Sequence, residues 1–182
     1  MSALQLDPDL IMALQALETH RVEFVLVGDV ASAIYDHGGF VAGLEIVPGG
    51  YGRNIERLMS ALDAMQAELG VAGRPDPRGL DWRSEQLVEL VPCTFMTIYA
   101  DIDVNFQPAG TNGFRDLFQD SSRIELAAGA RPDVASPEDL DRMAHGAAPA
   151  PPPAYPPAAL VPEPDLWSDE QIRASRAGRA HY

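Results

Sequence analysis

The alternation of apolar and polar positions predicts helices and strands that follow one another along the first part of the chain. Asp7 and Pro8 suit a helix cap and the first helical position, and leucines then recur at helical spacing. The next apolar run continues almost unbroken to Gly28, as in a strand covered on both faces. The predicted elements are a helix over residues 8–19, a strand over 22–27, a helix over 30–35 and a strand over 44–47.

A third helix is predicted after these elements. Asn54 is expected to cap it, its apolar residues recur at helical spacing up to Met65, and Gly70 is placed to end it. The turn-rich stretch that follows, residues 71–92, predicts no element before the apolar run 87–91.

Two further strands and a helix are predicted in the later part of the chain. β-Branched and aromatic residues favour strands over 94–99 and 102–106. Ser136 and Pro137, followed by two acids, begin a helix that runs to about Ala144. The whole pattern predicts an α/β (α+β) domain, with a mixed sheet flanked by helices.

The composition excludes several classes of function. All 13 basic residues are arginines, they stand against 27 acidic residues, and the formal net charge is -14. A nonspecific nucleic-acid surface is therefore not expected, because phosphate backbones are bound through clustered positive charge, although a local arginine pocket for one nucleotide stays open. The single cysteine, Cys93, excludes an internal disulfide and suits a free core thiol. No export signal and no apolar run of membrane-spanning length are found, so a cytoplasmic protein without a membrane partner is expected.

Composition also divides the chain into three parts. Residues 1–145 are expected to form the domain. Eight of the sixteen prolines lie within residues 149–164, so the segment 146–164 is expected to be an extended linker or strap. Residues 165–182 predict an amphipathic helix that is too short to be stable alone. Residues 146–182 are therefore expected to dock, either on their own domain or, through self-association or binding, on another protein.

A glycine turn and carboxylates on later strands point to one kind of chemistry. Gly28 joins an apolar strand to a helix, and helix N-termini offer backbone donors to phosphates. Asp101 and Asp103 are two residues apart, so they point to the same face of a strand. Divalent ions such as Mg²⁺ bind carboxylates that project from neighbouring strands, and Glu45 is the expected acid on the adjacent strand. This layout indicates nucleotidyl transfer from a nucleoside triphosphate (NTP).

The arrangement resembles the nucleotidyltransferase superfamily of the DNA polymerase beta type, and in particular the small bacterial abortive-infection or type IV toxin nucleotidyltransferases. The similar segments are FVLVGDVA (24–31), VAGLEIVP (41–48), NIERL (54–58), TIYADID (97–103) and VASPEDL (134–140). The resemblance covers about residues 10–145 and implies the nucleotidyltransferase fold. It also implies Gly28 at the phosphate turn, Glu45 as the second metal-binding acid and Asp103 as the third.

Several positions depart from the family pattern. Gly43 replaces the first acid, which removes a ligand shared by both metal ions. Asp29 replaces the second small turn residue and puts a negative side chain beside the phosphates. Asp29, Glu45 and Asp103 form a candidate rebuilt triad for one divalent ion; alternatively, Asp29 only caps the second helix. Arg53 and Arg57, on the third helix, are candidate contacts for an anionic ligand or part of an exposed helical face.

Two functions from different classes stay open. In the first, the chain is a nucleotidyltransferase-like pseudoenzyme with an eroded metal site, weakly active or noncatalytic, that acts through protein–protein interaction. In the second, it is an active, divergent, Mg-dependent nucleotidyltransferase that moves a nucleotidyl group from an NTP to an RNA or protein acceptor, as a toxin does. The lost acid, the intruding Asp29, the acidic composition and the lack of Lys or Arg in residues 143–146 favour the first.

Deletion of residues 146–182 is expected to leave the domain folded and to abolish an association, because a proline-rich strap and a short helix contribute only through docking. Circular dichroism checks the fold, and light scattering with partner binding checks the association. A truncated protein that has the same oligomeric state as the full chain and binds the same partners would contradict this interpretation.

Overall fold

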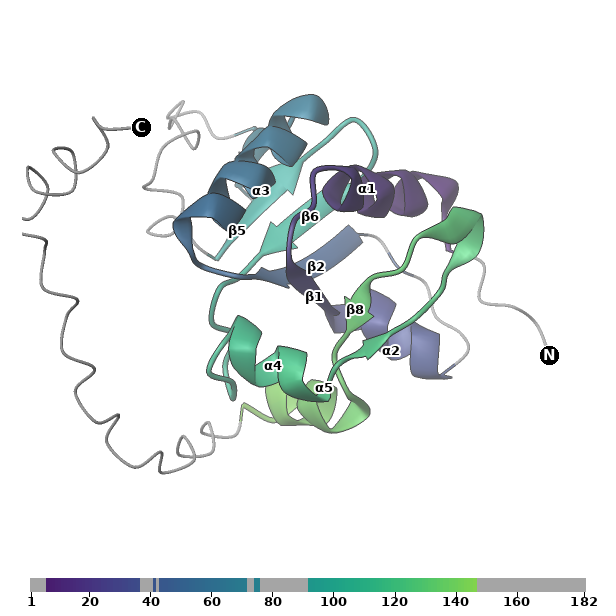
Figure 1. The fold of residues 1–182 in the computed structure, drawn as a ribbon, viewed down its shortest axis with the longest axis vertical. Helices are drawn as coiled ribbons and strands as arrows, with labels where there is room; N and C mark the ends of the chain where they lie inside the picture. The colour runs from purple at the N-terminus through teal and green to yellow at the C-terminus, as the bar shows by residue number, and fades with distance from the viewer. Residues whose placement is uncertain (1–5, 37–40, 42, 72–73, 76–91, 147–182) are drawn as a thin grey trace, which may run out of the picture. The chain divides into compact units, whose positions relative to one another are not determined.

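Short apolar segments pair into one mixed β-sheet in the computed structural model of the chain (Figure 1). The structure describes residues 6–36, 41, 43–71, 74–75 and 92–146. All of them belong to one unit, Met1–Pro149. The apolar run predicted over 87–91 lies outside the described residues, and so does the predicted linker and terminal helix beyond Gly146.

Within the described residues the strands follow the order β4-β3-β5-β6-β2-β1-β8-β7. β1 pairs antiparallel with β2 and parallel with β8, whereas β2 pairs parallel with β6. The strands are β1 (Phe24–Val27), β2 (Gly43–Pro48), β3 (Glu68–Val71), β4 (Arg74–Pro75), β5 (Cys93–Met96), β6 (Asp101–Val104), β7 (Ser122–Arg123) and β8 (Asp133–Val134). The expected α/β class with a mixed sheet and flanking helices is therefore confirmed.

Two helices begin where their capping residues predict. The helices are α1 (Pro8–Thr19), α2 (Gly28–Asp36), α3 (Gly52–Ala64), α4 (Phe114–Asp120) and α5 (Pro137–Ala144), with a short 3-10 turn, η2 (Ala127–Gly129). The Asp7 carboxylate accepts the Asp9 N–H at 2.9 Å, and the Ser136 hydroxyl accepts the Asp139 N–H at 3.1 Å, so both predicted starts are confirmed. None of the described helices has both the length and the apolar character needed to cross a bilayer.

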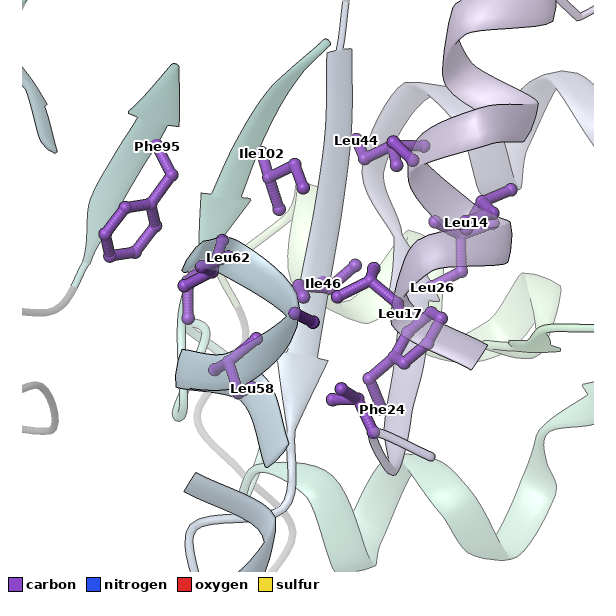
Figure 2. Packing of buried hydrophobic residues seen from close by; sticks show 14 of the residues in the cluster. Leu14, Leu17, Phe24, Leu26, Leu44, Ile46, Leu58, Leu62, Phe95 and Ile102 are labelled. Atoms are coloured by element: carbon purple, nitrogen blue, oxygen red, sulfur yellow. The ribbon is translucent and has the colours of Figure 1, made fainter. Parts of the chain in front are cut away.

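The side chains of the central strands alternate between two packed faces. On one face, leucines of α1 and α3 pack onto the sheet, as Figure 2 shows for Leu14, Leu17, Leu26, Leu44, Ile46, Leu58, Leu62 and Ile102. On the other face, Val25, Val27 and Val47 pack with Leu117 of α4. This period of two is the signature of strands that are covered on both sides, and it assigns odd-numbered positions of β1 and β2 to the second face.

Asn54 lies inside the first turn of α3 and does not cap the helix. The cap position is Tyr51, which has no side-chain capping bond. The fully buried Asn54 side chain instead accepts the Glu23 N–H at 2.8 Å and donates to the carbonyls of Glu23 and Gly49 at 2.8 and 2.9 Å. Asn54 therefore joins the residue before β1, the residue after β2 and the start of α3, and the capping prediction was wrong.

The end of α3 is also earlier than predicted. The helix ends at Ala64, and Gly70 lies within β3, where a Cβ atom would come within 3.2 Å of the Met96 side chain of β5. Several short elements had no counterpart in the sequence prediction; they are β3, β4, α4, β7 and β8.

Replacing Asn54 with Ala is expected to lower the free energy of unfolding by about 2–4 kcal/mol, because it removes three hydrogen bonds at once and takes from the Glu23 N–H and the buried Gly49 carbonyl the partner they have in Asn54. Urea denaturation measures the change. Ser60→Ala, on the exposed side of the same helix, is the control and should change stability by less than about 0.5 kcal/mol. Equal effects of the two substitutions would contradict the role given to Asn54.

Candidate functional site

The strand register brings the predicted acids together at one end of β1. Glu45 on β2 lies opposite Val27 of β1 on one side and opposite Asp103 of β6 on the other. Gly28 follows Val27 directly and opens α2. Gly28, Glu45 and Asp103 are therefore neighbours across three adjacent strands, in the positions that the sequence led us to expect.

Asp101 and Asp103 project from the same side of β6. Both are exposed, whereas Ile102 and Val104 between and after them are buried, which confirms the alternation expected of this strand. The Thr94 hydroxyl donates a hydrogen bond to the Asp103 carboxylate. Thr94 was not among the predicted site residues, although a short turn between the two predicted strands would have placed it opposite Asp103.

The Glu45 side chain packs directly against Gly28. A Cβ atom added to Gly28 would lie 3.0 Å from the Glu45 Cβ and 3.2 Å from its Cδ, tighter than nearly all Cβ contacts, so the Glu45 side chain would have to shift. Gly28 also has a φ of 68°, in the left-handed region that favours glycine. Glycine is thus required at this turn, and the space that its missing side chain leaves holds the Glu45 carboxylate group.

The surroundings of Glu45 disfavour its charged form. Burial raises the pKa of the Glu45 carboxyl above its usual value, and the negative charges of Asp103 and Asp29 raise it further. Asp29 itself is exposed in the first turn of α2, where a negative charge interacts favourably with the helix dipole. The three acids thus lie in one negative electrostatic field, and no positive charge among the described residues lowers the pKa of Glu45.

The position of the missing acid has no room for a side chain. Gly43 pairs with Asp101 on the parallel strand β6. A Cβ atom on Gly43 would lie 2.9 Å from the Asp101 carbonyl oxygen, and a backbone atom cannot move aside as a flexible side chain can. The close approach of β2 and β6 therefore explains glycine at this position.

The described acids do not make a complete metal site. No group of three or more His, Cys, Asp or Glu side chains within the described residues is arranged to hold a metal ion, and this includes the expected triad of Asp29, Glu45 and Asp103. Glu45 and Asp103 face each other as a pair, with the first acid absent. The donor set therefore does not fit the two-ion site of a nucleotidyltransferase.

Arg53 does not join this group. Its helix, α3, begins beside Glu23, which precedes β1, whereas Gly28 follows β1. Arg53 is exposed there, at the opposite end of the strand from the carboxylates. The structure thus leaves the predicted anion contact away from the phosphate turn.

An arginine on α5, the last of the described helices, already forms ion pairs. Arg142 of α5 forms ion pairs with Asp116 at 3.0 Å and with Asp139 at 2.6 Å. Burial raises the pKa of Asp139, while the Ser136 hydrogen bond and Arg142 act in the opposite direction. Arg142 thus ties α5 to α4, and two carboxylates already occupy its guanidinium group.

Cys93 has the character of an inert thiol. Burial, together with the charge of Asp103, raises its pKa to about 12. The thiol is therefore protonated near neutral pH, in agreement with the free core thiol expected from the sequence.

Comparison with known proteins adds no family to this geometry. No protein-family model matches the chain, and no curated protein matches it significantly. Any function proposed for the site therefore rests on its own residues and their geometry.

Glu45→Gln is expected to raise the melting temperature near neutral pH. The folded-state pKa of Glu45 is raised, so the stabilisation from its protonated form is complete below its usual pKa of 4.5 and is lost as the pH rises through the folded value. The Glu45→Gln substitution removes the negative charge, so it increases stability only at pH values at which Glu45 would otherwise be ionised. The advantage of the variant should be present at about pH 7.5 and absent at about pH 3.5 in thermal unfolding.

Glu68→Gln is the matched control, since Glu68 is an exposed acid on β3 and loses the same charge. It should change the melting temperature little at either pH. A Glu45→Gln variant that is less stable than the parent at both pH values would show that the carboxylate is favourably placed, contrary to the interpretation above.

Proposed function

We propose that this chain is a nucleotidyltransferase-fold domain with an eroded metal site, weakly active or noncatalytic, that acts through protein–protein interaction. The order of its elements supports this proposal: a strand, the Gly28 turn and a helix are followed by strands that bear Glu45 and Asp103. The same two acids lie side by side in the register of β2 and β6.

One observation carries the noncatalytic part of the proposal, namely the packing of Glu45 against Gly28. A phosphate needs free backbone donors and a positive or neutral field at the turn that binds it. Here a carboxylate group lies over the glycine, and Asp29 adds a second negative charge in the first helical turn. Both charges oppose a triphosphate at this place.

The tight fit at Gly43 supports the same conclusion. Restoring an acid at this position requires β2 and β6 to separate, because the Asp101 carbonyl occupies the space. A single substitution is therefore not expected to rebuild the two-ion site. This suits a domain that has changed its role rather than one that lacks a single ligand.

The second candidate, an active and divergent nucleotidyltransferase, has one observation in its favour. Asp103 and Asp29 both raise the pKa of Glu45, so the three acids are close enough to interact. Such a like-charge cluster would gain from a bound cation such as Mg²⁺. The proposed partner surface, residues 146–182, is compatible with either candidate, since its support is the sequence alone.

Addition of Mg²⁺ to the full chain already mixed with ATP, CTP, GTP or UTP is expected to raise the melting temperature by less than about 1 °C above the value measured with the same NTP in EDTA. For comparison, a site occupied at a hundredfold excess over its Kd gains about 2.7 kcal/mol, or roughly 5–10 °C for a domain of this size. Incubation with NTPs labelled on the α-phosphate should transfer little or no label to protein or RNA.

Glu45→Ala and Asp103→Ala provide the controls. A metal-dependent shift of several degrees in the parent protein that disappears in both variants would establish a working site and overturn the noncatalytic proposal. Transfer of label that depends on the same two residues would favour the second candidate.

A further inference from the structure

An open cleft rich in arginine lies at the other end of β1, away from the carboxylates. Its volume is about 500 Å³, within the range of small-ligand sites. Four of the chain's 13 arginines line it, alongside two acids; the six residues are Arg21, Arg57, Arg123, Arg131, Glu18 and Glu23. The chain has a net charge of -14 and no lysine, so four arginines around one cleft are a local exception to its acidic composition.

Three parts of the fold build the cleft. The Arg131 N–H donates to the Glu18 carboxylate at 2.7 Å, which fastens the segment between β7 and β8 to α1. The Arg57 guanidinium donates to the Arg21 carbonyl at 3.2 Å, which joins α3 to the turn after α1. The arginines are thus placed by segments far apart in sequence and held together by the fold.

Arg21 occupies a backbone position that favours glycine. Its φ is 57°, and it follows His20, the C-cap of α1. The next residue, Val22, donates its N–H to the Leu17 carbonyl at 3.0 Å, the hydrogen bond of a Schellman motif. A side chain at this left-handed position is disfavoured. Gln66 holds the equivalent position after α3 with a φ of 52°, so the backbone conformation alone does not single out Arg21. What distinguishes Arg21 is its place at a cleft with three more arginines.

The cleft arginines keep donors free of the contacts described for them. Three are ion-paired, as Arg57–Glu23 at 3.3 Å, Arg123–Asp133 at 3.1 Å and Arg131–Glu125 at 2.8 Å. Each of these pairs uses one terminal nitrogen of a group that has five N–H donors. Arg21 makes no ion pair with any described residue.

These ion pairs are also weakly held. The side chains of Arg123 and Arg131 are 68% and 61% exposed, and exposed pairs contribute little to stability. A multivalent anion can therefore share the guanidinium groups or displace the carboxylates. Bidentate contacts from arginine suit the geometry of phosphate oxygens in particular.

We infer that this cleft binds a small phosphate-bearing anion of the polyphosphate type, free or carried by a nucleoside. A compact ligand fits better than a nucleic acid, since the negative charge of the remaining surface repels a long polyanion. The cleft is separate from the carboxylate site, because Glu23 and Gly28 stand at opposite ends of β1. This inference does not depend on the proposed function.

Isothermal titration of the full chain with sodium tripolyphosphate, ADP and ATP tests the inference, in EDTA and at constant ionic strength. Saturable binding of tripolyphosphate is expected without any metal ion. Comparison of tripolyphosphate with the two nucleotides shows whether the nucleoside contributes. Two results would overturn the inference. One is the absence of saturable binding, and the other is that sulfate, at equal ionic strength, competes for the site as effectively as tripolyphosphate itself.

Arg21→Gly is the decisive variant, because it removes a guanidinium while giving the turn its preferred residue. Binding should weaken at least about tenfold, as expected for a lost charge-assisted contact, while the melting temperature is unchanged or higher. Arg131→Gln should weaken binding similarly. Stability and binding therefore change in different directions in the first variant, so unfolding cannot account for the loss.

Two control variants test whether the ligand lies in the cleft. Arg115→Gln removes an exposed arginine of α4 outside the cleft and should leave the Kd within about twofold. Glu45→Gln should also leave the binding intact. An equal loss in Arg115→Gln would indicate nonspecific electrostatic attraction, and a loss in Glu45→Gln would move the ligand to the carboxylate site; either result overturns the inference.

Discussion

The register of β2 between β1 and β6 determines where the candidate carboxylates of this protein lie. Successive strand residues point to opposite faces, so a slip of one residue would carry Glu45 into the packed face that holds Leu44 and Ile46. Asn54 opposes such a slip, because it binds the backbone on both sides of the β1–β2 pair. The buried amide of α3 thus supports the position of an acid at the far end of the strand.

That register has an electrostatic cost. It places Glu45 across from Asp103 and near Asp29, and burial adds to the penalty on the charged form. A site selected for binding metal would offset this repulsion with a cation held by further ligands. The structure instead has glycine at position 43, where the close Asp101 carbonyl leaves no room for a side chain. The described residues therefore form no group that could hold a cation and so offset the repulsion.

Local signals in the sequence were sufficient for part of this fold. Asp7 and Ser136 act at short range, and both helix starts were confirmed, as were the central strands and the alternation of Asp101 and Asp103. Asn54 misled because a good capping residue is also a good partner for a neighbouring backbone, and only tertiary structure selects between these roles. Strands of two residues, such as β7 and β8, carry too few positions for a periodic pattern.

The candidate site, like the fold, could be predicted from the sequence only in part. Glu45 and Asp103 were predicted as neighbours from the pattern of their strands together with the family resemblance, whereas the position of Thr94 depends on the pairing of β5 with β6. The arginine cleft is built by three separate parts of the chain, and of its arginines the sequence pointed only to Arg57 as a candidate anion contact. Net charge was a poor guide here: a total of -14 describes the average field, which governs the approach of a large polyanion. A small ligand inside a cleft interacts chiefly with the charges within a Debye length, about 8–10 Å at ordinary ionic strength. Around this cleft the four arginines are matched by Glu18, Glu23, Glu125 and Asp133, so the local field is close to neutral rather than strongly negative.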